Sequence, residues 1–203
     1  VEAVVGDAAT RYLTQVNEKL HKQIIQLTEA CAGIAAKLNT QFTAPEWNEN
    51  SSVDLLNDTI SSLQASQKEL AKKLESQEAL LLNELFETHQ KSFVTINEIH
   101  FVGVHLKLSN AEHLKKLAQQ LGTIYTPSVV VLTAEAGGKA NIALAISEDL
   151  VTGKNWQAPT IIKEKIAPLI KGGGGGQKTI ATAGGQDASQ LDKVIELIKN
   201  MIA

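Results

Sequence analysis

Five consecutive glycines, Gly172–Gly176, are the residues of this chain that most directly suggest a binding chemistry. Lys171 precedes them, and Gln177, Lys178 and Thr179 follow. Backbone N–H groups approach an anion most closely where no Cβ stands in the way, and neighbouring lysines add positive charge. The pattern predicts a folded glycine-rich loop that contacts a sugar-phosphate backbone by its shape rather than by its bases. The candidate residues are Lys171, Gly172, Gly173, Gly174, Gly175, Gly176, Gln177, Lys178, Gly184 and Gly185, with Lys154, Lys163 and His105 as neighbours.

A loop for nucleotide hydrolysis fits this segment less well. A Walker-type loop needs glycine immediately before its lysine, and Gln177 occupies that position. Residues 161–170 upstream also have the pattern of a helix, whereas a Walker loop follows a buried strand. The alternative of a flexible linker is disfavoured by the two flanking lysines and by the Gly184-Gly185 pair before a helix start.

The charge of the chain is unevenly distributed. The whole chain carries a net charge of -3, but residues 1–97 have 8 Lys and Arg against 13 Asp and Glu, and residues 98–203 have 11 against 9. The second half is therefore the expected side for a polyanion.

We find no catalytic or metal-binding pattern in the sequence. The histidines, His21, His89, His100, His105 and His113, lack the spacing of a paired metal-ligand motif and are expected to be structural or on the surface. Cys31 is the only cysteine, which excludes an intrachain disulfide and favours a reducing cytoplasm. It lies on an apolar helix stripe and is expected in the core. No membrane segment or signal peptide is predicted, and a start at Val1 with Met201 as the only methionine suggests a piece of a longer protein.

Residues 13–97 are predicted to form a long helical hairpin. Apolar residues recur every three or four positions from Leu13 to Leu38, and a heptad pattern runs from Val53 to Leu81 with Gln67 and Gln77 at core positions. Because the connection between the two helices looks short, we expect an antiparallel coiled coil that acts as a spacer.

Residues 98–203 are predicted to form a small α/β domain, which makes the whole chain α+β or α/β in class. Strands are expected at 99–108, 129–133, 140–146 and 179–182, and helices at 110–121, 160–169 and 187–201.

Two segments resemble a known family. The segment Gly172–Asp187 resembles the glycine-rich signature of the DHH-associated domain at the end of alanyl-tRNA synthetases, in which Gly-Gly follows the glycine run after seven residues. Gln177 stands where many members have arginine, and Lys171 where some have a sixth glycine. Residues 1–12, from Val1-Glu2-Ala3-Val4-Val5-Gly6 through Tyr12, resemble the exit of the editing domain in the same family, with Val5 in place of the usual threonine.

The resemblance implies that the chain is the C-terminal, bacterial-type region that binds the elbow of tRNA(Ala) and contributes to a homodimer. It implies partners in the aminoacylation and editing domains of one polypeptide, where ATP, magnesium and zinc are used, and no cofactor in this fragment. Two alternatives stay open. One is the substrate-binding domain of a DHH-type phosphoesterase, although no Asp-His-His triplet is present; the other is a dimeric coiled-coil scaffold that binds nothing.

Overall fold

The structure, a computed structural model, describes residues 6–108 and 110–203. Of the predicted editing-domain exit, residues 1–5 lie outside the described residues. The chain divides into two compact units, Val1–Leu80 and Leu81–Ala203. This division falls inside a helix, so the last turns of that helix belong with the second unit rather than with the predicted hairpin.

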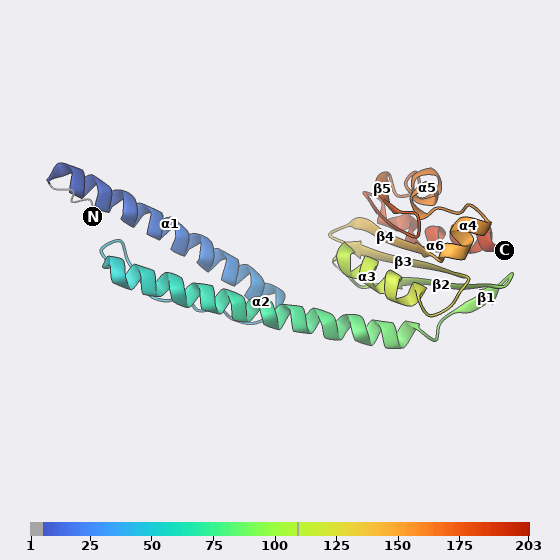
Figure 1. Ribbon diagram of the computed structural model, residues 1–203, viewed down its shortest axis with the longest axis horizontal. Helices are drawn as coiled ribbons and strands as arrows, with labels where there is room; N and C mark the ends of the chain where they lie inside the picture. Colours follow the sequence, from blue (N-terminus) through green and yellow to red (C-terminus); the bar gives the residue numbers. More distant parts are fainter. Residues whose placement is uncertain (1–5, 109) are drawn as a thin grey trace. The chain divides into compact units, whose positions relative to one another are not determined.

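The first unit contains α1 (Asp7–Lys37) and the larger part of α2 (Val53–His89), the two long helices that the apolar periodicity predicts (Figure 1). Cys31 is buried between them, as expected, and its thiol donates to the Leu63 carbonyl at 3.5 Å. The core of this unit consists of Ile24, Cys31, Leu56, Ile60 and Leu63.

The two helices run in the same direction, and the prediction of an antiparallel hairpin is wrong on this point (Figure 1). Cys31 contacts Leu63, and ten residues earlier in α1 the ring of His21 lies 5.1 Å from that of Trp47. Val53 likewise precedes Leu63 by ten residues, so parallel helices place it level with His21. In an antiparallel pair, Val53 would instead lie about 30 Å from the level of His21 and Trp47, measured along the helix axis. The six residues from Trp47 to Val53 can span only about 20 Å, so they could not reach that position.

The connection that makes this direction possible is residues 38–52, which contain no helix or strand. Instead of turning tightly, the segment returns alongside the helices, with Phe42 and Trp47 packed against their core. The packed core ends near Leu70, because α1 ends at Lys37. Consequently Gln77, predicted at a core position, is exposed.

The second unit is a mixed α/β domain, as predicted. Its six strands have the order β1-β2-β3-β4-β6-β5, in which only β2 and β3 are parallel neighbours. The strands are β1 (Val94–Ile96), β2 (Ile99–Leu106), β3 (Ser128–Ala136), β4 (Lys139–Ile146), β5 (Gly172–Gln177) and β6 (Ile180–Gly185). The edge strand β1 was not predicted; it is only three residues long.

Helices cover both faces of this sheet, each over its own apolar core. One face carries α4 (Glu148–Gly153), α5 (Ala158–Ile161), the π-helical η1 (Ile162–Ile166), the 3-10 turn η2 (Ala188–Gln190) and α6 (Leu191–Ile202). The other carries α3 (Ala111–Gly122) and the last turns of α2, through Leu82, Leu85 and Phe86. The single helix predicted at 160–169 is thus α5 continued by a π-turn, in which Ala167 N–H donates to the Ile162 carbonyl at 2.8 Å.

Candidate functional site

The glycine run is a strand, and the prediction of a loop is wrong. β5 is the edge strand of the sheet and pairs antiparallel with β6, with Gly174 opposite Ala183. A two-residue turn at Lys178 and Thr179 joins the two strands. All six residues of β5 are exposed. Gly184 and Gly185, the predicted partners of the run, pair with Gly173 and Gly172.

The glycines of β5 alternate between two environments. A Cβ added at Gly174 would lie 2.2 Å from the Thr182 carbonyl oxygen and 2.8 Å from the Ile162 side chain. Gly172 and Gly176 meet the backbone of β6 in the same way. At Gly173 and Gly175 an added Cβ would meet nothing within 4 Å. Packing within the chain therefore explains three of the glycines, whereas the other two leave bare backbone on the open face of the strand.

Two of the predicted lysines lie beside the first half of this strand. Lys163 and Lys171 line an open hollow together with Ala167, Pro168 and Gly172–Gly174. Lys171 adopts a φ of 49° and directs its ammonium group to Asp187, with Nζ 3.3 Å from Oδ2. Its side chain remains 74% exposed, so the ion pair does not remove it from solvent.

Asp187 is a site residue that the sequence analysis missed. Its Oδ1 accepts hydrogen bonds from the backbone N–H and the hydroxyl of Ser189, at 3.2 and 2.6 Å. The Ser189 hydroxyl, then Lys171, and to a smaller degree the Ser189 N–H hold the pKa of the Asp187 carboxyl below its ordinary value. A single aspartate at a helix start gives no sequence signal that it pairs with a lysine sixteen positions earlier.

Replacing Asp187 by asparagine tests this pair by its pH dependence. A depressed pKa means that the carboxylate stabilises the fold above its unfolded-state pKa and loses that contribution as the pH falls through the folded-state value. Asparagine keeps an acceptor for Ser189 but has no charge. Wild-type stability should therefore fall more steeply than that of Asp187→Asn between neutral pH and pH below the ordinary value of 3.8. Urea unfolding at both pH values measures this; parallel curves would contradict the assignment.

The other predicted residues lie further away. Gln177 and Lys178 are at the far end of β5, about 17 Å from Gly172 at 3.4 Å per residue. The Lys154 ammonium group lies 5.0 Å from the centre of the Trp156 ring. His105 is on β2, four strands from β5, and its Nδ1 lies 3.1 Å from the Thr133 hydroxyl. The structure therefore gathers Lys163, Lys171 and the glycines, and it does not bring His105 to them.

Comparison with known proteins identifies the second unit. The family model of the DHHA1 domain matches residues 99–203, which is more than half of the chain. The chain belongs to the DHHA1 domain family. It is 32% identical over 167 residues to the alanine–tRNA ligase of Cytophaga hutchinsonii, an alignment that covers 82% of this chain and 18% of the relative. It is 29% identical over 202 residues to that of Geobacillus kaustophilus, covering 100% of this chain and 20% of the relative.

These relatives confirm the resemblance to alanyl-tRNA synthetases along the whole chain, which spans about a fifth of their length. Among solved structures, the C-Ala domain from Aquifex aeolicus alanyl-tRNA synthetase is 23% identical, with a TM-score of 0.49 over 54% of this chain and 96% of that chain.

Within residues 6–108 and 110–203, no three or more His, Cys, Asp or Glu side chains are grouped so that they could hold a metal ion. In the same residues, no helix is both long enough and apolar enough to cross a membrane.

Proposed function

We propose that this chain is the tRNA-binding and dimerising C-terminal part of an alanine–tRNA ligase, and that it holds the elbow of tRNA(Ala) against strand β5. The observation that carries the proposal is the open face of this strand, where Gly173 and Gly175 are glycine although no atom of the described residues lies within 4 Å of an added Cβ. A side-chain-free backbone allows the ribose-phosphate chain of RNA to approach closely. Similarity to alanine–tRNA ligases over the whole chain makes a tRNA the expected RNA.

Lysines at both ends of β5 suit this role. Lys163 and Lys171 lie beside its start, and Lys178 lies in the turn after its end. With about 17 Å between the ends of the strand, they can contact phosphates several nucleotides apart. Such contacts position an RNA by its backbone and shape, and they weaken as salt rises.

Residues 38–67 of the first unit are a poor surface for RNA. Residues 38–67 contain no lysine or arginine but include Glu46, Glu49, Asp54 and Asp58. These four carboxylates repel a polyanion. We therefore assign this unit to dimerisation and to spacing between domains.

The remaining functions belong to the longer protein. We propose that its other parts, the aminoacylation and editing domains, use ATP, magnesium and zinc, and that the whole enzyme works in the cytoplasm. The phosphoesterase alternative is disfavoured, because alanine–tRNA ligases match this chain along its entire length.

The test of this function is binding of tRNA(Ala) by the 203-residue chain at two salt concentrations, with a minihelix that lacks the elbow as competitor. The proposal is supported if tRNA(Ala) binding weakens as the salt concentration rises and the minihelix does not displace the tRNA. Failure to bind either RNA contradicts it and leaves the scaffold alternative, and light scattering on the same sample reports whether the copies pair.

The substitution Gly175→Val should separate an effect on contact with RNA from an effect on folding. Because an added Cβ at this position points into open space, the variant should keep the stability of the wild type. The branched side chain would hold the RNA backbone away from the strand, and loss of about 1 kcal/mol in contacts corresponds to roughly fivefold to tenfold weaker binding. Filter binding and urea unfolding measure the two effects. Undiminished affinity in the folded variant would place the RNA elsewhere.

A further inference from the structure

The outer side of α2 carries two exposed leucines on one line. Leu55 is 46% exposed and Leu80 is 71% exposed. They are 25 residues apart, close to seven turns of helix, so they point in nearly the same direction about 37 Å apart. Both lie in the first compact unit. We call this side the outer face of α2; its exposed residues include Asp54, Leu55, Asp58, Ser62, Ala65, Glu69, Lys72, Lys73 and Leu80.

Charge divides the outer face into two halves of opposite sign. Its first half carries Asp54 and Asp58, and Glu46 and Glu49 lie in the connection just before α2. Its second half carries Lys72 and Lys73, with Lys68 nearby; Glu69 is the acidic residue there, and it pairs with Lys73 at 2.7 Å. Asp54 and Asp58, and Glu46 and Glu49 of the connection, form no ion pair with another described residue.

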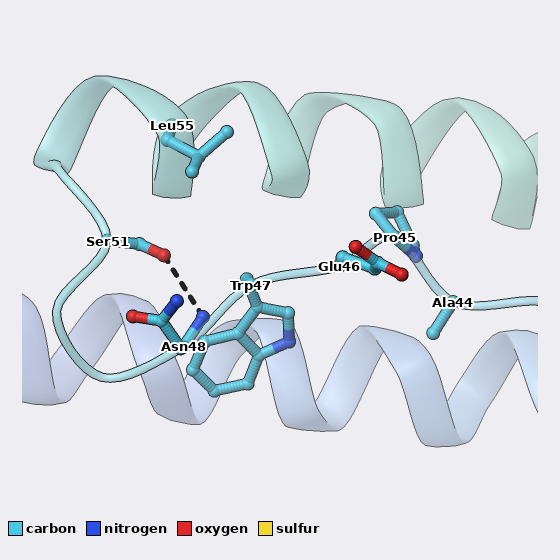
Figure 2. A pocket seen from close by; sticks show the side chains of 7 residues that line it. All are labelled: Ala44, Pro45, Glu46, Trp47, Asn48, Ser51 and Leu55. Carbon is cyan, nitrogen blue, oxygen red and sulfur yellow. Dashed lines mark hydrogen bonds between the residues drawn. The ribbon is translucent and has the colours of Figure 1, made fainter.

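Each half also contains an open hollow. At the start of α2 a hollow lies between the helix and the returning connection, lined by residues that include Glu46, Trp47, Ser51 and Leu55 (Figure 2). The Asn48 N–H donates to the Ser51 hydroxyl at 3.0 Å across the turn that closes it (Figure 2). In the second half, the side chains of Lys72, Lys73 and Leu80 line another open hollow.

We propose that a second copy of this chain docks on the outer face of α2, with the two α2 helices antiparallel. The two-fold axis crosses the outer face at the level of Gln67 and Lys68 along the helix. In this arrangement Leu80 of each copy enters the hollow beside Leu55 of the other. Lys72 and Lys73 then face the acidic first half of the other copy. The inference rests on the dimerisation in the proposed function and deepens it by naming the surface.

Charge complementarity selects the antiparallel direction. Parallel α2 helices would oppose acid to acid and lysine to lysine, which is unfavourable at both ends. On the outer face, Glu69 lies about 2 Å along the helix from the axis and is paired with Lys73, while the small residues Ala65 and Ser62, about 4 and 8 Å from the axis, allow the helices to approach. A contact about 37 Å long and about 10 Å wide buries about 740 Å² in total, which is below the size of stable interfaces and is that of a weak, transient dimer. The dimer should therefore be concentration-dependent and weakened by salt.

Charge-reversal variants of the 203-residue chain test this surface by sedimentation velocity. One variant combines Glu46→Lys with Asp58→Lys, and the other combines Lys72→Glu with Lys73→Glu. Each should raise the dimer dissociation constant at least tenfold, because each opposes like charges twice in the symmetric dimer. An equimolar mixture of the two should dimerise again, since one copy then supplies lysines where the other supplies carboxylates. A control for the first variant, Glu29→Lys with Glu75→Lys, makes the same change in net charge as that variant but away from the outer face, and it should dimerise as the wild type does.

The outcomes separate this surface from the wider proposal. A wild type that stays monomeric overturns both the surface and the proposed dimerisation. A dimer that survives both charge reversals leaves the proposed dimerisation standing and overturns the outer face as its site. The outer face is also overturned if the mixture fails to dimerise although both variants keep the wild-type helix content by circular dichroism. Affinity for tRNA(Ala), measured on the same samples, reports independently on the role of β5.

Discussion

Replacing Gly174 by alanine is expected to lower the free energy of unfolding of the second unit by about 2 to 3 kcal/mol, as overpacking of a closely packed site does. The added Cβ would lie 2.2 Å from the Thr182 carbonyl oxygen and 2.8 Å from the Ala183 Cα. Both atoms belong to the backbone of β6, which cannot move aside as a flexible side chain can. β5 must therefore shift away from β6, weakening its hydrogen bonds.

The matched control is the neighbouring substitution Gly173→Ala, which makes the same chemical change on the opposite face of the strand. No atom lies within 4 Å of the added Cβ, so alanine should be tolerated. It should even stabilise the unit by about 0.5 kcal/mol, because alanine reduces the conformational freedom of the unfolded chain. Urea unfolding followed by Trp156 fluorescence, in a Trp47→Phe background, reports on the second unit alone. Equal effects of the two alanines would show that the alternation along β5 has no structural meaning.

From the sequence, the buried side of each helix or strand is predicted more accurately than the arrangement of these elements in space. The apolar stripe through Cys31 and the heptads from Val53 correctly indicate two long packed helices. Periodicity identifies a buried side but carries no information on direction. Direction was decided by Trp47 and Phe42, which lie in a segment that looks like a polar break and yet pack against the helical core.

The glycine strand shows the same limit at the candidate site. Glycine has low strand propensity, and five in a row predict a loop. The run is nevertheless a strand because β6 provides a paired backbone, and the absence of side chains allows the close approach that Gly174 makes to Thr182. Short-range patterns therefore pointed to the glycine run and to the lysines beside it as a candidate site. They gave neither the ion pair between Lys171 and Asp187 nor the three strands, β3, β4 and β6, that lie between His105 and the run.

Removing the three lysines around β5 is expected to weaken binding of tRNA(Ala) by roughly a hundredfold. Each phosphate contact that a lysine makes releases condensed counterions, which corresponds to about fivefold in affinity at roughly 0.15 M salt. The variant combines Lys163→Ala, Lys171→Ala and Lys178→Ala. The slope of log affinity against log salt should also become shallower by about 2 to 3. Both quantities come from one set of filter-binding titrations.

The control for this variant removes three other exposed lysines, Lys116 of α3 with Lys193 and Lys199 of α6. It changes the net charge from -3 to -6 just as the first variant does, so a loss caused by overall charge alone would be equal in both. A large loss confined to Lys163, Lys171 and Lys178 would localise the phosphate contacts to β5. Equal losses would instead mean that a diffuse field attracts the RNA, in which case the bare backbone at Gly173 and Gly175 needs another explanation. The combination with Gly175→Val separates these cases further, because valine alters the shape of the strand without changing its charge.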